Sequence, residues 1–257
     1  MWMRSADGRV YAHSSSQDKG PSVQNFSVTI GKPVSRDYLL AIDEPQPVKG
    51  NPLAFSHQEV IAVANHFAEV RVLSRERATK SAILASLPDA SVLHFSGYAK
   101  AEWNEPLQSG VLLANGERLT AVDLATLRLT GARLAVLSTS DTDVVGIHPL
   151  HEVMPLSAAL LRAGFAGVIS SLWPVSDLST AILMERFYRL WREEGLAPAH
   201  ALRQAQQWLR DATTAELGLA DRHERLFQAS GRRDRQAFRA MRLYKAYPDD
   251  KPFAHPY

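Results

Sequence analysis

Short apolar runs alternate with amphipathic stretches from about residue 37 onward. The stretches between the runs carry apolar residues at helical spacing, and the runs have the length of buried strands. Strands that alternate with helices in this way indicate a mostly parallel sheet with helices on both faces. We therefore predict an α/β fold whose main strands are the runs 38–42, 70–73, 91–95, 132–138 and 165–171.

Capping and turn residues mark where the intervening helices begin and end. The capping-box pattern Ser56–Glu59 (SHQE) predicts a helix of about 14 residues that starts there. Thr79 predicts the cap of a shorter helix, and Ser176 with Asp177 predicts the start of a long one. Asn115 followed by glycine predicts a tight turn.

The loops at the carboxyl ends of the strands are the expected place for a site. In open sheets of this kind, ligands and chemistry gather where the parallel strands end. The sequence predicts three such loops, at Ser96–Lys100, Thr139–Gly146 and Leu172–Asp177.

The chain contains no cysteine. This excludes a disulfide, a thiolate zinc site, an iron–sulfur cluster and a cysteine nucleophile. His148 and His151 are spaced three apart, but no third metal ligand accompanies them, so we expect neither a metal nor a cofactor. With 29 Lys and Arg against 27 Asp and Glu, the net charge of +2 is too small to indicate nucleic-acid binding.

The first 36 residues are polar and rich in serine, with Phe26, Val28 and Ile30 alternating like a short strand. We interpret residues 1–36 as a polar leader or edge hairpin and residues 37–257 as one domain. The start of the chain lacks the apolar core of a signal peptide, and no apolar segment is long enough for a membrane span. We therefore expect a cytoplasmic protein.

Several motifs follow one another in a fixed order. They include Leu93–Tyr98 (LHFSGY), Leu107–Leu113 (LQSGVLL), Ala132–Ser140 (ARLAVLSTS), Gly164–Asp177 (GFAGVISSLWPVSD) and Ala201–Gln206 (ALRQAQ). In this order the motifs resemble the CHAT domain, the caspase-like module often found beside tetratricopeptide repeats. The resemblance covers about residues 37–257, and Trp173-Pro174 with Asp177 is its most specific part. It implies the caspase–hemoglobinase fold, a mostly parallel sheet with helices on both faces.

The resemblance implies peptide hydrolysis by a His–Cys dyad, but both dyad positions differ here. The histidine position falls on Tyr98 and the cysteine position on Ser140, while His94 matches an upstream histidine that we interpret as structural. A serine attacks only when a base removes its proton, and a phenol with a pKa of about 10 is a poor base at neutral pH. We predict a pseudo-peptidase that acts as a regulatory or protein-interaction module.

The alternative is an active peptidase or hydrolase that uses Ser140 as its nucleophile. Its base would be His94, His148 or His151. Around either kind of site, the resemblance and the chain order suggest pocket residues. These candidates are His94, Asp141, Trp173 and Asp177; Glu152 also matches an acidic position of the family.

We expect a protein or peptide partner, either a tetratricopeptide-repeat region or an active protease, and no membrane. The chain stops at His255-Pro256-Tyr257, where the family continues into a last strand. Either the strand is absent or the chain was cut there, and an absent strand would leave an edge for another chain to pair with. Eight basic residues between Arg222 and Lys245 are interleaved with aromatic ones, which we interpret as a solvated helix face rather than a nucleic-acid surface.

Overall fold

The computed structural model describes residues 2–4, 10–12, 37–46, 52–102, 104–141, 154–171 and 175–254. It divides into two compact units, Met1–Ala181 and Ile182–Tyr257. Near the N-terminus, β1 (Trp2–Arg4) and β2 (Val10–Ala12) pair antiparallel. The strand predicted around Val28 lies outside the described residues.

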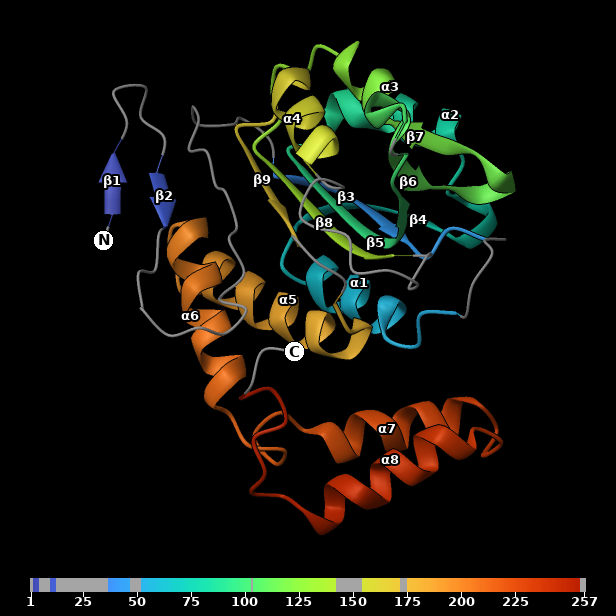
Figure 1. The fold of residues 1–257 in the computed structure, drawn as a ribbon, viewed down its shortest axis with the longest axis vertical. Helices are drawn as coiled ribbons and strands as arrows, with labels where there is room; N and C mark the ends of the chain where they lie inside the picture. The colour runs from blue at the N-terminus through green and yellow to red at the C-terminus, as the bar shows by residue number, and fades with distance from the viewer. Residues whose placement is uncertain are drawn as a thin grey trace. The chain divides into compact units, whose positions relative to one another are not determined.

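The first unit is built on a seven-stranded sheet, which confirms the predicted α/β class (Figure 1). Five of its strands are parallel, and a short antiparallel hairpin pairs with the end of the central strand β5. The parallel strands lie in the order β4 (Glu69–Ser74), β3 (Tyr38–Asp43), β5 (Val92–Lys100), β8 (Leu134–Asp141) and β9 (Gly167–Ser170). The hairpin consists of β6 (Gly110–Leu112) and β7 (Arg118–Thr120).

Helices lie on both faces of this sheet. The helix α1 (Ser56–Ala64) covers one face, and three helices cover the other (Figure 1). These three are α2 (Lys80–Ser86), α3 (Ala121–Ala125) and α4 (Met154–Ala163). Their apolar residues form one core with alternate residues of β3, β5 and β8, among them Ile42, Phe95 and Leu137.

Most local signals in the sequence are confirmed. The hydroxyl of Thr79 accepts the N–H of Ala82, and Thr120 with Asp123 forms a capping box at the start of α3. Asn115 and the glycine after it both have positive φ, 61° and 72°, as a tight hairpin turn requires. Three-residue 3₁₀ turns follow several elements, at Arg75–Arg77, Leu87–Asp89, Pro106–Gln108 and Ala114–Gly116.

The capping box predicted at Ser56–Glu59 is wrong. The helix does begin at Ser56, but it spans 9 residues, and the residue at its N-cap, Phe55, makes no side-chain cap. The Ser56 hydroxyl donates instead to Asp43 in the sheet. A tertiary partner therefore takes the group that a local motif would have used.

The loop predicted at Ser96–Lys100 is wrong, because β5 continues to Lys100. The start of the loop predicted at Thr139–Gly146 also belongs to a strand, since β8 continues to Asp141; residues 142–146 lie outside the described residues. The parallel ladder pairs Tyr98 with Ser140 and Ala99 with Asp141. On its other side, the end of β5 pairs with β6 through Ala99 and Lys100. The polar residues that predict loops here satisfy their backbone groups within the sheet.

The second unit is helical. The boundary between the units falls within α5 (Asp177–Arg192), which α6 (Pro198–Asp211), α7 (Leu219–Ala229) and α8 (Arg235–Ala246) follow. Apolar side chains of α5 are buried, and the Phe187, Tyr188 and Trp191 rings lie 5.0 to 5.7 Å apart. None of the described helices is long and apolar enough to cross a membrane.

Candidate functional site

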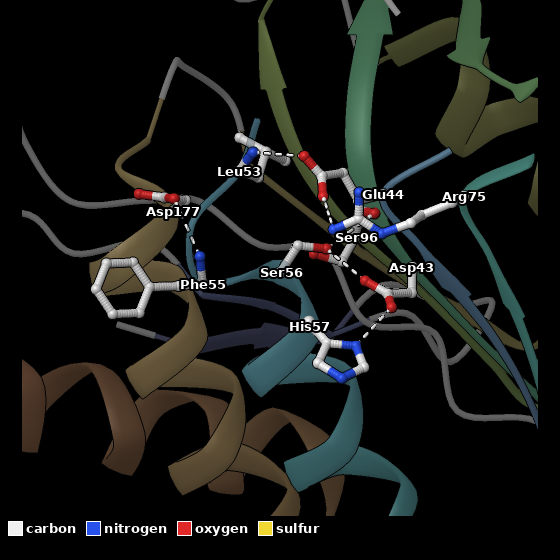
Figure 2. A network of polar contacts seen from close by, with 9 residues as sticks. All are labelled: Asp43, Glu44, Leu53, Phe55, Ser56, His57, Arg75, Ser96 and Asp177. Carbon is white, nitrogen blue, oxygen red and sulfur yellow. Dashed lines mark hydrogen bonds and ion pairs between the residues drawn. The ribbon is translucent and has the colours of Figure 1, made fainter. Parts of the chain in front are cut away.

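A polar network lies where the carboxyl ends of β3 and β5 meet the start of α1 (Figure 2). Its centre is Asp43, the last residue of β3, whose side chain is 3% exposed. One oxygen, Oδ1, accepts the hydroxyl of Ser56 at 3.2 Å, and Oδ2 lies 2.8 Å from Nδ1 of His57. A single buried carboxylate therefore fixes the first two residues of α1.

The His57 ring stands at the edge of this network. Its side chain is 66% exposed, although its Nδ1 contacts a buried carboxylate. A carboxylate at one ring nitrogen orients the imidazole and directs Nε2 to the opposite side. The network thus presents one oriented, accessible imidazole.

Deeper in the network, Glu59 of α1 connects to the face of β5. Its Oε2 accepts the hydroxyl of Ser96 at 3.2 Å. Its Oε1 lies 3.1 Å from Nε2 of His94, an ion-pair distance, although the two atoms are not aligned for a hydrogen bond. Both side chains are buried, so this pair belongs to the packing between helix and sheet.

Glu44 continues the network beyond Asp43 in a left-handed conformation, with φ 40°. Its N–H donates to the carbonyl of Ser96, and its Oε1 accepts the N–H of Leu53 at 2.7 Å. Its Oε2 lies 3.5 Å from Nη2 of Arg75, which is also left-handed, with φ 51°. Burial raises the pKa of the Glu44 carboxyl, against the lowering effect of Leu53 and Arg75. Two residues in sparsely populated conformations meet here, as is common at functional sites.

Tyr98 lies toward the end of β5 and is 8% exposed. Burial raises the pKa of its phenol, and the negative charges of Asp177 and Glu44 raise it further. The phenol therefore stays protonated across the physiological range. Asp177, the first residue of α5, accepts the N–H of Phe55 at 3.4 Å (Figure 2). It also accepts the N–H of Leu178 at 2.8 Å.

The structure brings some of the predicted site residues together. Tyr98 and Ser140 are Cα partners in the ladder between β5 and β8, and Asp141 pairs with the next residue of β5. His94 pairs with Val136, four residues before Ser140 and thus roughly 13 Å away along the strand. The predicted residues His148, His151, Glu152 and Trp173 lie outside the described residues.

The sequence reasoning missed the acidic end of β3 and the start of α1. Asp43 and Glu44 directly follow a predicted parallel strand, so the rule that sites gather at carboxyl ends could have found them. Ser56 and His57 carried a local capping signal, which concealed their tertiary role. Within the described part of the chain, no three His, Asp or Glu side chains are placed to hold a metal ion.

Comparison with protein families gives a match over nearly the whole chain. A family model described as the CHAT domain matches residues 3–257. No curated protein matches the chain. The match and the mixed α/β sheet agree on a caspase-like architecture.

Proposed function

The chain belongs to the CHAT domain family, a caspase-like and peptidase-related group, and from this we propose that it is a pseudo-peptidase. Its sheet keeps the family's architecture, and the polar end of the sheet, where β3 and β5 meet α1, binds a peptide or protein segment without cleaving it. The protein then serves as a regulatory or interaction module. The observation that supports this proposal best is the buried phenol of Tyr98, whose pKa is raised by burial, at the position that the resemblance assigns to the family's base histidine.

Proton transfer is the step that fails. A serine hydroxyl becomes a nucleophile when a neighbouring base accepts its proton. The residue in register with Ser140 is Tyr98, whose raised pKa leaves it unable to accept that proton near neutral pH. The negative charges of Glu44 and Asp177 near the phenol also oppose a second negative charge at this end of the sheet.

His94 does not replace the missing base. It is fully buried and held against Glu59. A general base needs a separation of about 3 Å, directly or through one water. The register separates His94 from the level of Ser140 by roughly 13 Å.

The same charges favour a cationic ligand. Asp43 and Glu44 are buried at the end of β3, and Asp177 lies at the start of α5. The carboxylates of Asp177 and Glu44 act on the Tyr98 phenol, and together with Asp43 at the end of β3 they favour a Lys or Arg side chain of a bound peptide. We expect binding of basic peptides that weakens on Glu44→Gln or Asp177→Asn, while Glu76→Gln on the exposed turn after β4 leaves it unchanged.

Restoring the dyad tests the proposal directly. Because the chain has no cysteine, Ser140→Cys introduces a single thiol and labelling is unambiguous. Combined with Tyr98→His, this thiol should react with iodoacetamide at about pH 6 at least about tenfold faster than in Ser140→Cys alone, because a nearby imidazolium lowers thiol pKa values. The wild-type protein should neither cleave peptides nor label with a fluorophosphonate. Peptide hydrolysis by the wild-type protein that is lost in Ser140→Ala would falsify the proposal.

A further inference from the structure

The helices α7 and α8 pack side by side as a hairpin in the second unit (Figure 1). Ring contacts join them: Phe227 lies 5.1 Å from Phe238, and His223 lies 5.1 Å from Tyr244, measured between ring centroids. On α8 the buried residue is Ala237. These contacts define which side of α8 faces α7 and which side faces outward.

The outward side of α8 is basic. Arg235, Arg239 and Arg242 follow one another at the i, i+4, i+7 spacing of a single helix face, and all three are exposed. Phe238 and Leu243, 39% and 55% exposed, border them. We call these five residues the arginine face of α8. The helix contains no acidic residue.

Two basic residues elsewhere on this hairpin form ion pairs. Lys245 lies 2.9 Å from Glu224, and Arg222 lies 2.7 Å from Glu185. Within the described residues, Arg235, Arg239 and Arg242 form no ion pair with an acidic side chain. The three arginines also destabilise α8. Like charges three and four residues apart repel each other, and Arg235 in the first turn lies at the positive end of the helix dipole.

We propose that the arginine face of α8 docks an acidic, amphipathic segment of a partner protein. Carboxylates on the partner would relieve the repulsion among the three arginines and bind their guanidinium groups through paired hydrogen bonds. The helix has 12 residues and is about 18 Å long, so a partner helix of about three turns would match it.

The apolar border of the face favours protein over nucleic acid. Phe238 and Leu243 would lie against phosphates in a nucleic-acid complex, whereas a protein segment can bury them with its own apolar side chains. The guanidinium of Arg242 lies 6.0 Å from the centroid of the Phe238 ring, a cation–π arrangement. Arginine and aromatic residues in one cluster are typical of the residues that dominate protein interfaces.

A peptide library tests this inference on the full chain. Random 16-residue peptides displayed on phage are selected for binding to the wild-type protein. Peptides that also bind the variant Arg235→Glu, Arg239→Glu, Arg242→Glu are removed. The retained peptides should be enriched in Asp and Glu with apolar residues at helical spacing. A synthetic peptide of the enriched sequence should bind the wild-type protein at least about tenfold more tightly than this triple variant.

A matched variant and two other probes complete the experiment. Arg225→Glu, Arg232→Glu, Arg233→Glu reverses the same number of exposed charges on the same hairpin and should weaken peptide binding less than about threefold. Circular dichroism establishes that both variants are folded. Failure to enrich acidic peptides overturns the inference. So does equal loss in the two variants, or tighter binding through the arginine face to duplex DNA or phosphatidylserine vesicles than to the selected peptide.

Discussion

Tyr98 and Ser140 are Cα partners in the parallel ladder between β5 and β8. The two positions that the family resemblance assigns to its dyad are therefore neighbours across two adjacent strands. On the other side of β5, Asp43 pairs with Ser96, two residues before Tyr98.

The raised pKa of the Tyr98 phenol should make the folded protein less stable at alkaline pH. A pKa raised in the folded state means that its stabilising contribution is complete below the unfolded value of about 10 and is lost as the pH rises through the folded value. Tyr98→Phe lacks this loss, so its alkaline unfolding should shift to higher pH. In absorbance titrations of tyrosinate, one group that ionises above the ordinary tyrosine range in the folded wild-type protein should be missing from Tyr98→Phe. Identical titration curves would contradict the raised pKa.

Glu44 should give a second pH dependence at the acid end. Burial raises its pKa, so its contribution to stability is complete below the ordinary value of about 4.5 and is lost as the pH rises through its higher folded value. Glu44→Gln should therefore gain stability relative to the wild-type protein between about pH 4 and pH 7 in urea unfolding. Arg75 lowers the pKa of Glu44. Arg75→Gln should therefore raise that pKa further and enlarge the fall in stability that the wild-type protein shows as the pH rises. If the difference in the free energy of unfolding between Glu44→Gln and the wild-type protein stays the same across this pH range, the pKa of Glu44 is not raised.

The sequence predicts the sheet well and its polar end poorly. Strands and helices follow from periodicity, and Thr79 and Thr120 mark caps because their partners lie three residues away in the chain. Ser96 and Ser140 look like loop residues because serine and neighbouring glycine or aspartate are typical of loops, and their pairing partners are about 40 residues distant. Whether Ser56 caps its own helix or binds Asp43 depends on tertiary contacts that no local pattern encodes.

The buried pair Glu59 and His94 should be strongly coupled. Removing one member leaves the other buried without its counter-group, so Glu59→Leu and His94→Leu should each lower the free energy of unfolding by about 3 kcal/mol. The double variant should recover much of that loss, because the remaining polar group is then removed as well. Chemical denaturation of the four proteins measures the coupling. Additive losses would show that the two side chains do not act as a pair.

If His94 is structural, its replacement should change neither peptide binding nor the reactivity of a thiol at position 140. In the folded Glu59→Leu, His94→Leu protein, basic peptides should bind as tightly as in the wild-type protein. Reactivity of the thiol in Tyr98→His, Ser140→Cys should also persist when the two leucines are added. Loss of either property in a folded variant would show that His94 acts in the candidate site and would contradict its structural interpretation.

The glycine that ends α4 should be intolerant of any side chain. Gly164 has φ 125°, and a Cβ there would overlap the carbonyl oxygen of Leu129. That segment cannot easily withdraw, because the N–H of Leu129 donates to Ala163 at 2.7 Å. Gly116 also has positive φ, but nothing lies within 4 Å of the position its Cβ would take. Gly116→Ala should therefore cost only about 1 kcal/mol of stability for its left-handed backbone, and Gly164→Ala should cost about 3 kcal/mol or more. Thermal unfolding of the two variants compares them, and similar losses would mean that backbone conformation alone, without the contact to Leu129, requires glycine at this helix end.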